Sequence, residues 1–240
     1  MIVDFHSHIL PRMDDGSDSM RTSLLMLRAE RQQGVQRVVL TPHFYCEKES
    51  VSSFLQRRNR AFAALQAKID RKTFPELCLG AEVAMSSALR DMDLQPLCIA
   101  GTNVLLLELP YHNRFRPREV EAIVNRNDVQ IVFAHIERFY RLWDRDIFFT
   151  VMELPVYKQI NCGALLHAKW WERRRLLRWI ADGEIHLLGT DAHNLTNRVI
   201  NMQPALHLLE RKKLSAEAAE MMKRATRLTN PSIQRRKGYR

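Results

Sequence analysis

The chain has few cysteines, and they form no recognisable framework. The four cysteines in 240 residues include no CxxC pair and follow no regular spacing. We therefore expect reduced thiols in a cytoplasmic protein. The residues six places after each cysteine are Ser52, Ala84, Val104 and Ala168. None is the arginine that grips phosphate in a cysteine-based phosphatase, so that mechanism is excluded.

Glycine-rich phosphate loops and long apolar runs are also missing. No glycine precedes a lysine, which excludes a P-loop, and neither G-x-G-x-x-G nor G-x-S-x-G occurs. The longest uncharged run, residues 94–107, is shorter than the ~20 apolar residues that a bilayer span requires. The first residues carry Asp4 and lack the basic and apolar regions of a signal peptide. We expect a protein that is not embedded in a membrane.

Positive charge is concentrated near the C-terminus. Residues 211–240 hold ten Lys/Arg and two Glu, a net of +8 out of +10 for the whole chain. One interpretation is a solvated last helix with a basic tail. The other is attraction to an acidic partner, such as nucleic acid or an anionic membrane surface.

Short apolar runs alternate with longer amphipathic ones. The predicted strands are residues 2–5, 36–41, 78–83, 103–109, 130–134, 158–161 and 186–190. The predicted helices are residues 19–33, 51–71, 116–126, 144–154, 169–181, 204–213 and 215–228. Strands that alternate with helices indicate an α/β fold with a parallel sheet. An odd number of about seven strands, without a phosphate loop, favours a (β/α) barrel over an open sheet.

Metal-ligand side chains recur where the predicted strands end. They are His6, His8, His43, Glu82, Glu108, His135, Asp191 and His193, and Asp14 and Asp15 lie in the loop after the first strand. The carboxyl ends of all strands of a parallel barrel converge on one face. These side chains are therefore predicted to meet in one bowl.

The chemistry of this set favours several divalent cations. Glu82 and Glu108 each stand in an apolar strand, where an ionised carboxylate is costly unless it is paired or metal-bound. His6 and His8 have strand spacing, so both can face one ion. Imidazoles and carboxylates without thiolates suit Mn²⁺, Fe²⁺, Co²⁺ or Zn²⁺. Eight or nine ligands exceed the needs of one ion and predict two or three, an arrangement that suits phosphoryl transfer.

The sequence resembles the PHP (polymerase and histidinol phosphatase) family. The motifs that carry the resemblance are His6-Ser7-His8, Asp15-Gly16, Thr41-Pro42-His43, Gly80-Ala81-Glu82, Leu107-Glu108, Ala134-His135-Ile136-Glu137-Arg138 and Thr190-Asp191-Ala192-His193-Asn194. Within the family, the sequence is most similar to the bacterial manganese-dependent protein-tyrosine phosphatases of capsule and exopolysaccharide operons, the CpsB/YwqE type.

The resemblance implies a single distorted (β/α)7 TIM-like barrel over residues 1–232, followed by a basic tail at 233–240. It implies a first ion held by His6, His8, Glu82 and Asp191, a second by Glu82, Glu108 and His135, and a third by Asp15, His43 and His193. Asp15 is preferred to Asp14 because the family's ligand precedes the glycine. Arg138 and Arg198 would hold the phosphate. The cofactors would be two or three divalent ions, Mn²⁺ before Fe, Co or Zn.

The implied function is hydrolysis of phosphotyrosine by a metal-bridged hydroxide, on a membrane-associated bacterial tyrosine kinase. The alternatives are another PHP activity, acting on histidinol phosphate or on nucleic acid, and a binding module with a relic site. The basic tail is the feature that favours nucleic acid.

Two aromatic and basic segments are candidates for substrate docking. Residues 111–116 follow the fourth strand, and are either a rim of the bowl or an ordinary exposed loop. Residues 170–175, WWERRR, begin a helix; they either contribute to docking or, as we expect, belong to a helix that packs its tryptophans and solvates its arginines. We predict no role for Asn161 beyond packing at a strand end.

Overall fold

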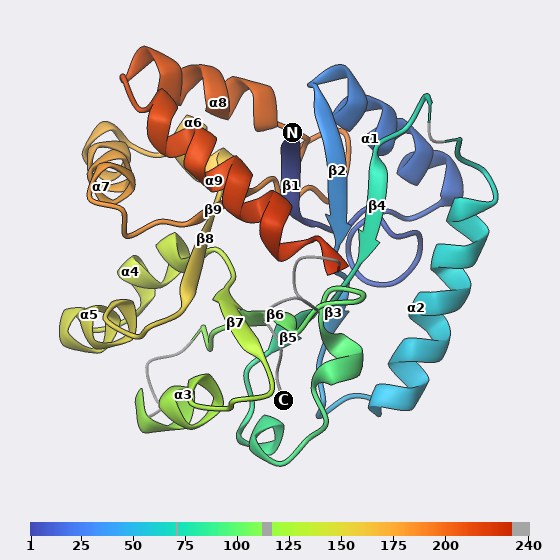
Figure 1. Cartoon of the computed structure of the whole chain (residues 1–240), viewed down its shortest axis with the longest axis horizontal. Helices are drawn as coiled ribbons and strands as arrows, with labels where there is room; N and C mark the ends of the chain where they lie inside the picture. Colours follow the sequence, from blue (N-terminus) through green and yellow to red (C-terminus); the bar gives the residue numbers. More distant parts are fainter. Residues whose placement is uncertain (71, 112–116, 232–240) are drawn as a thin grey trace.

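A single parallel sheet, curled on itself, forms the centre of the molecule (Figure 1). The computed structural model describes residues 1–70, 72–111 and 117–231. The first part of the sheet has the order β1-β2-β4, with β1 Ile2–Ser7, β2 Val35–Leu40 and β4 Glu76–Leu79. The second part has the order β3-β5-β6-β7-β8-β9, with β3 His43–Phe44, β5 Glu82–Ala84, β6 Val104–Glu108, β7 Gln130–Phe133, β8 Tyr157–Asn161 and β9 Leu187–Gly189.

Two strand positions each consist of two short strands: the break at Gly80-Ala81 interrupts the predicted strand 78–83, and the other break begins at Thr41, the last residue of the predicted strand 36–41. Strand β3 continues the course of β2 after Thr41-Pro42, and β5 continues β4 after Gly80-Ala81. Hydrogen bonds bridge the interruptions, from Gly80 N to Leu40 O at 2.8 Å and from Glu82 N to Pro42 O at 3.0 Å. Seven strand positions therefore result, as the sequence predicted.

The last strand position returns to the first. Ser7 forms a parallel bridge with Ala192, and Asp191 N donates to His6 O at 2.8 Å. Buried Asp4 supports the junction, because its carboxylate accepts from the amide (2.8 Å) and the hydroxyl (2.6 Å) of Thr190. The predicted α/β fold, a distorted TIM-like barrel, is confirmed.

Helices surround the sheet. The longer ones are α1 Met20–Gln32, α2 Val51–Gln66, α3 Pro117–Val124, α5 Arg145–Met152, α7 Trp170–Ala181, α8 Met202–Arg211 and α9 Ser215–Leu228. Short helices that the sequence did not predict are α4 Phe139–Leu142 and α6 Cys162–His167, with 3-10 turns η1 Ser87–Arg90, η2 Gln95–Leu97 and η3 Ile136–Arg138. Ser19 and Ser50 cap α1 and α2 by accepting a backbone N–H through their hydroxyls. Helix α2 ends before the predicted boundary at Arg71, and Arg71 and Arg116 lie outside the described residues.

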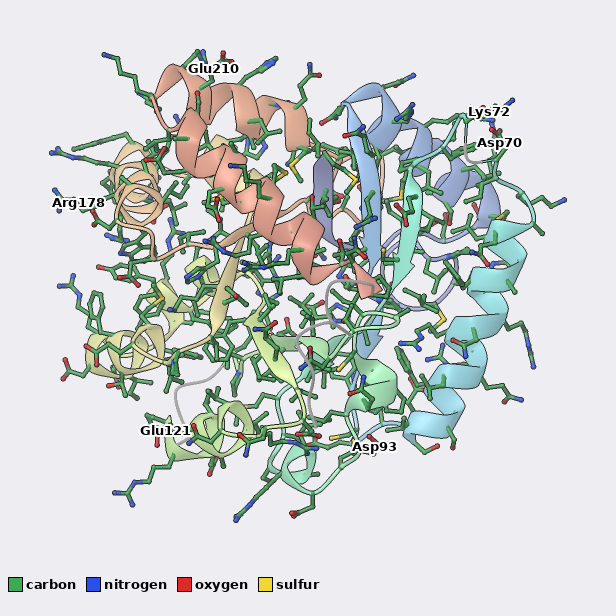
Figure 2. The ribbon with its side chains drawn as sticks, in the orientation of Figure 1. Asp70, Lys72, Asp93, Glu121, Arg178 and Glu210 are labelled. Carbon is green, nitrogen blue, oxygen red and sulfur yellow. The ribbon has the colours of Figure 1, made fainter. Side chains whose placement is uncertain are left out.

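Two apolar clusters stabilise this arrangement. The inner one fills the barrel and joins α9, and consists of Val3, Phe5, Val39, Ile99, Val104, Leu106, Val132, Ala134, Leu187, Ala225 and Leu228. The outer one packs the helices against the sheet. Charged side chains such as Arg178 and Glu210 project from the periphery (Figure 2).

Helix α9 accounts for part of the basic C-terminal segment. It packs against β1 and β9. Arg224 donates to His186 O at 3.2 Å and Arg227 to the Tyr157 hydroxyl at 3.2 Å. These residues of the segment thus have structural contacts, whereas the tail at 233–240 lies outside the described residues. Among the residues that the structure describes, no helix is long and apolar enough to cross a membrane.

Candidate active site

The nine predicted metal ligands lie together at the carboxyl ends of the strands. His6 and His8 come from the end of β1, His43 from β3, Glu82 from β5 and Glu108 from β6. His135, Asp191 and His193 directly follow β7 and β9, and Asp15 comes from the loop after β1. Seven of these side chains are buried, His43 is half-buried, and Asp15 is 65% exposed.

Three groups of ligand atoms can be distinguished. In the first, Glu82 Oε2 lies 3.2 Å from both His6 Nε2 and His8 Nε2, and Asp191 Oδ1 lies 3.6 and 3.3 Å from the same nitrogens. In the second, His135 Nε2 lies 2.6 Å from Glu82 Oε1 and 3.4 Å from Glu108 Oε1.

The third group is nearer the solvent. Asp15 Oδ1 lies 3.6 Å from His43 Nε2 and 3.4 Å from His193 Nε2. The groups overlap, because His8 also falls within reach of the third and His43 within reach of Glu82 and Glu108. This overlap is the arrangement that adjacent ions with shared ligands require.

Several buried ligand atoms have no hydrogen-bond partner. Glu82 Oε2 is one, although His43 Nδ1 also lies only 3.0 Å from it. Asp191 Oδ1 and His193 Nε2 are others. A buried polar atom without a partner is costly. Oxygen and nitrogen atoms that face one another in this way, with no thiolate among them, fit divalent cations.

Neighbouring polar groups orient the histidines. His8 Nδ1 lies 2.7 Å from Asp14 Oδ2, His6 Nδ1 lies 3.3 Å from Gln159 Oε1, and His193 Nδ1 lies 2.9 Å from the Asp191 carbonyl oxygen. If each Nδ1 carries the hydrogen, each Nε2 presents a lone pair to the groups described above.

Asp14 and Asp15 have different environments. Asp14 Oδ1 accepts from Gly16 N at 3.0 Å, and Asp14 Oδ2 accepts from His43 N at 2.9 Å, so both oxygens of this carboxylate already have donors within the protein. Gly16 allows the tight turn, because a Cβ there would lie 2.3 Å from His8 O. Asp15 alone of the two faces the third group, as the sequence predicted.

The buried histidines among the proposed metal ligands have pKa values shifted in opposite directions. Burial lowers the pKa of His6 and His8, but the carboxylates of Glu82 and Asp191, and Asp14 for His8, outweigh it and leave both pKa values raised. Burial lowers the pKa of His135 and His193 to about 4. Protons therefore compete with bound cations more strongly at His6 and His8 than at His135 and His193.

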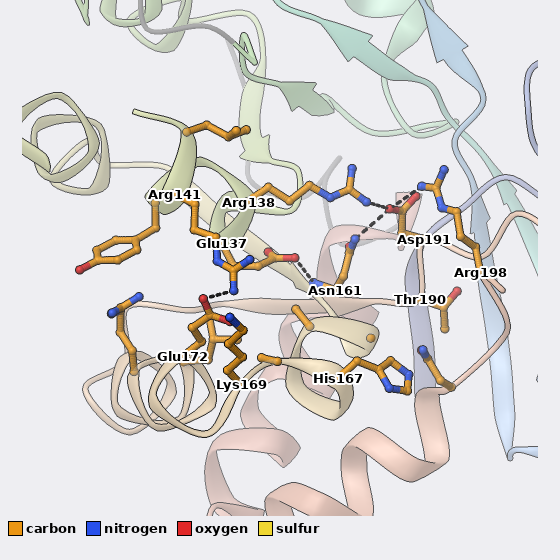
Figure 3. A pocket seen from close by; sticks show the side chains of 18 of the residues that line it. Glu137, Arg138, Arg141, Asn161, His167, Lys169, Glu172, Thr190, Asp191 and Arg198 are labelled. Atoms are coloured by element: carbon orange, nitrogen blue, oxygen red, sulfur yellow. Dashed lines mark hydrogen bonds and ion pairs between the residues drawn. The ribbon is translucent and has the colours of Figure 1, made fainter. Parts of the chain in front are cut away.

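Two arginines border the metal-ligand groups. Arg138 and Arg198 both pair with Asp191 Oδ2, the Arg198 contact measuring 2.8 Å (Figure 3). Arg138 Nη1 also donates to the Tyr111 hydroxyl at 2.9 Å, which in turn donates to Glu108 Oε1 at 2.9 Å. Tyr111 thus connects a predicted metal ligand with a predicted phosphate-binding arginine, a role that the sequence did not reveal.

Asn161 has more than a packing role. Its Nδ2 donates to Asp191 Oδ2 at 2.8 Å, and its Oδ1 accepts from Gln159 Nε2 at 3.0 Å. Gln159 Oε1 also accepts from His135 N at 2.8 Å. Our prediction of strand-end packing alone was therefore wrong. The strand-end position of Asn161, shared with the ligands, was the signal that should have included it.

A cavity of about 770 Å³ opens beside the arginines. Its inner end is lined by Thr190, Asp191, Asn161, Arg138 and Arg198, and its outer part by residues of α4, α6 and α7 (Figure 3). Tyr111 lines it as well, whereas residues 112–116 of the predicted rim lie outside the described residues.

The start of α7 differs from our expectation. Trp170 and Trp171 are 67% and 46% exposed, so they are not packed in the core. The helix instead turns Glu172, Arg175 and Trp179 towards the cavity, a spacing of three to four residues that defines one helical face.

Comparisons with known proteins show the family of the chain and agree with its fold. The family described as "Capsular polysaccharide synthesis, CpsB/CapC" matches residues 2–230, and the chain belongs to this family. The resemblance recognised in the motifs is thereby confirmed.

Named relatives extend over most of the chain. The tyrosine-protein phosphatase YwqE of Bacillus subtilis (strain 168) is 28% identical over 233 residues, which cover 92% of this chain and 88% of YwqE. The tyrosine-protein phosphatase CpsB of Streptococcus pneumoniae is 25% identical, covering 92% of this chain and 94% of CpsB.

Solved structures share the architecture. A crystal structure from work on YwqE and CpsB, described as unique metal-dependent tyrosine phosphatases, superposes with a TM-score of 0.78 at 24% identity and covers 96% of this chain and 95% of the other. Histidinol phosphate phosphatase from Lactococcus lactis, complexed with zinc, L-histidinol and phosphate, gives 0.52 at 14% identity, covering 93% and 90%. At these identities the likeness concerns the fold.

Proposed function

We propose that this chain is a metal-dependent protein-tyrosine phosphatase with a role in capsule or exopolysaccharide synthesis. The observation that carries the proposal is a cluster of buried metal-type ligands beside Arg138 and Arg198, at the inner end of a cavity. The names of YwqE and CpsB, relatives over nine-tenths of the chain, support the same activity.

The metal ligands are His6, His8, Asp15, His43, Glu82, Glu108, His135, Asp191 and His193. Glu82 would be shared between two of the ligand groups, because its two oxygens face different histidines. We propose two or three divalent ions, Mn²⁺ in preference to Fe, Co or Zn. When bound, such ions supply Lewis acidity and an acidified water for hydrolysis of a phosphate ester.

Arg138 and Arg198 bind the phosphate. Their guanidinium groups converge on Asp191 Oδ2. Phosphate oxygens placed next to this carboxylate would accept from the same donors. Donors fixed before the reaction stabilise the charge that develops on the phosphoryl oxygens. Tyr111 positions Arg138, and Asn161 positions Asp191.

The cavity receives the tyrosine ring. Apolar side chains such as Ala164, Leu176 and Trp179 line it beside the charged groups. A phenolate is a fair leaving group, so the residues need supply less acid catalysis than an alkyl phosphate would require. The proposed substrate is a phosphotyrosine-bearing protein, a membrane-associated bacterial tyrosine kinase, and the proposed location is the cytoplasm.

Phosphate release tests the proposal. Protein loaded with Mn²⁺ should release phosphate from a phosphotyrosyl peptide, and a chelator should abolish the release. Protein shown to contain metal that releases no phosphate from the peptide, but does so from histidinol phosphate or a short oligonucleotide, would contradict the assignment.

A further inference from the structure

The cavity extends well beyond the site of the phosphate. Its volume of about 770 Å³ is in the upper part of the ~300–1,000 Å³ range of ligand pockets. The outer part lies between α4 and α7, away from the metal-ligand groups. It therefore offers room for residues next to the phosphotyrosine as well as for the ring.

The charged groups of this outer part are mostly basic. Arg141 comes from α4, Lys169 from the residue before α7, and Arg175 from α7, and all three line the cavity. Besides Asp191, two acidic residues line the cavity: Glu137, whose carboxylate accepts from Asn161 N at 3.3 Å, and Glu172, which is paired with Arg141 (Figure 3). The negative charge of Glu172 is thereby compensated within the protein.

Lys169 and Arg175 remain available to a ligand. Within the described residues, neither side chain forms an ion pair with a carboxylate. Their contacts are with rings, Lys169 Nζ lying 5.2 Å from the ring centre of Trp171 and the Arg175 guanidinium carbon 3.6 Å from that of Tyr140. Stacking on a ring fixes the plane of a guanidinium and leaves the N–H groups at its edge free to donate.

From this arrangement we infer that the outer cavity binds acidic residues that flank the phosphotyrosine. Lys169 and Arg175 would donate to their carboxylates, and a basic flank would be repelled. The inference deepens the proposed function and depends on it. It assigns to this enzyme a preference for phosphotyrosine in an acidic peptide.

The test uses three phosphotyrosyl peptides of equal length, whose flanking residues are Glu, Gln or Lys. Wild-type protein loaded with Mn²⁺ should show kcat/KM in the order Glu, Gln, Lys, with up to about fivefold for each exposed charge pair. The ratio for the Glu and Gln peptides should shrink in high salt, because exposed charges are screened.

Variants test whether Lys169 and Arg175 cause the preference for the Glu peptide. The double variant Lys169→Gln/Arg175→Gln should bring the Glu-to-Gln ratio close to one. Arg178→Gln is the matched control, because Arg178 lies on the same helix, is exposed, projects from the periphery of the molecule (Figure 2) and is not among the described residues that line the cavity. It should keep the wild-type ratio. Lys169→Gln alone, at an exposed position, should give an intermediate ratio if the double variant folds poorly.

A binding measurement separates recognition from turnover. Fluorescence anisotropy with peptides that carry a non-hydrolysable phosphotyrosine analogue should reproduce the order Glu, Gln, Lys. Equal kcat/KM values for the three peptides, or a ratio unchanged in the double variant, would overturn the inference while the phosphatase activity stands. Failure of the wild-type protein to release phosphate from any of the peptides or from p-nitrophenyl phosphate would instead overturn the proposed function.

Discussion

Replacement of Asp14 by Asn tests how the bowl is organised. The Asp14 carboxylate receives the His8 ring and two backbone amides, and these interactions outweigh burial and lower its pKa from 3.8 to about 2. A pKa lowered on folding contributes stability above the unfolded value near 4, and the contribution is lost as the pH falls towards 2. The lowering corresponds to about 2 kcal/mol at neutral pH.

The substitution removes the charge and turns an amide donor towards other donors. In metal-free protein at pH 7 we expect the melting temperature to fall by about 4–8 °C, at roughly 2–4 °C per kcal/mol for a domain of this size. Metal affinity should fall by about 10–100-fold, because a metal-binding histidine usually loses that much affinity when the group hydrogen-bonded to its other ring nitrogen is removed.

Asp15→Asn is the matched control. Asp15 is 65% exposed, and among the described residues its ion pairs are those within the third group and with Arg198. Its loss should weaken metal retention without lowering the melting temperature of the metal-free protein. Thermal unfolding in chelator and a metal titration measure both quantities. An Asp14→Asn variant that unfolds at the wild-type temperature and binds metal with wild-type affinity would show that Asp14 does not hold His8 in place.

Other predictions concern Arg138, the Tyr111 hydroxyl that contacts it, and proton release from the histidines on metal binding. Arg138→Ala should retain metal but lose about 10²–10³-fold in kcat on a phosphotyrosyl peptide, and full turnover would exclude its role. Tyr111→Phe should reduce kcat about fivefold for the lost hydrogen bond from Arg138, and it should weaken metal binding because Glu108 loses the hydroxyl that donates to it. Metal binding should release protons and weaken as the pH falls, because the pKa values of His6 and His8 are raised in the metal-free protein. Calorimetry in buffers of different ionisation enthalpy would detect these protons, and their absence would contradict the assigned protonation.

The ligand positions could be predicted because they depend on local pattern. Glu82 and Glu108 each stand at the end of an apolar run, and parallel topology brings the ends of such runs together. The strand interruptions were not predictable, because they depend on the pairing of β2 with β4 before Pro42 and Gly80 and of β3 with β5 after them.

The contacts around the ligands were harder to predict. Asn161 and Asp191 are thirty positions apart, and Tyr111 and Arg138 twenty-seven, so only the folded backbone brings them together. The predicted packing of Trp170 and Trp171 was wrong, because it relied on their hydrophobicity alone. The helix turns its Glu172 and Arg175 face inwards and leaves the tryptophans exposed at its first turn.

Metal content shows whether the strand ends form a multinuclear metal centre. Protein loaded with Mn²⁺ and then desalted should contain two or three ions per chain by mass spectrometry. His8→Ala and Asp191→Ala should lose metal and nearly all phosphatase activity. A folded wild-type chain that retains no metal, or the same content in both variants as in wild type, would contradict the account.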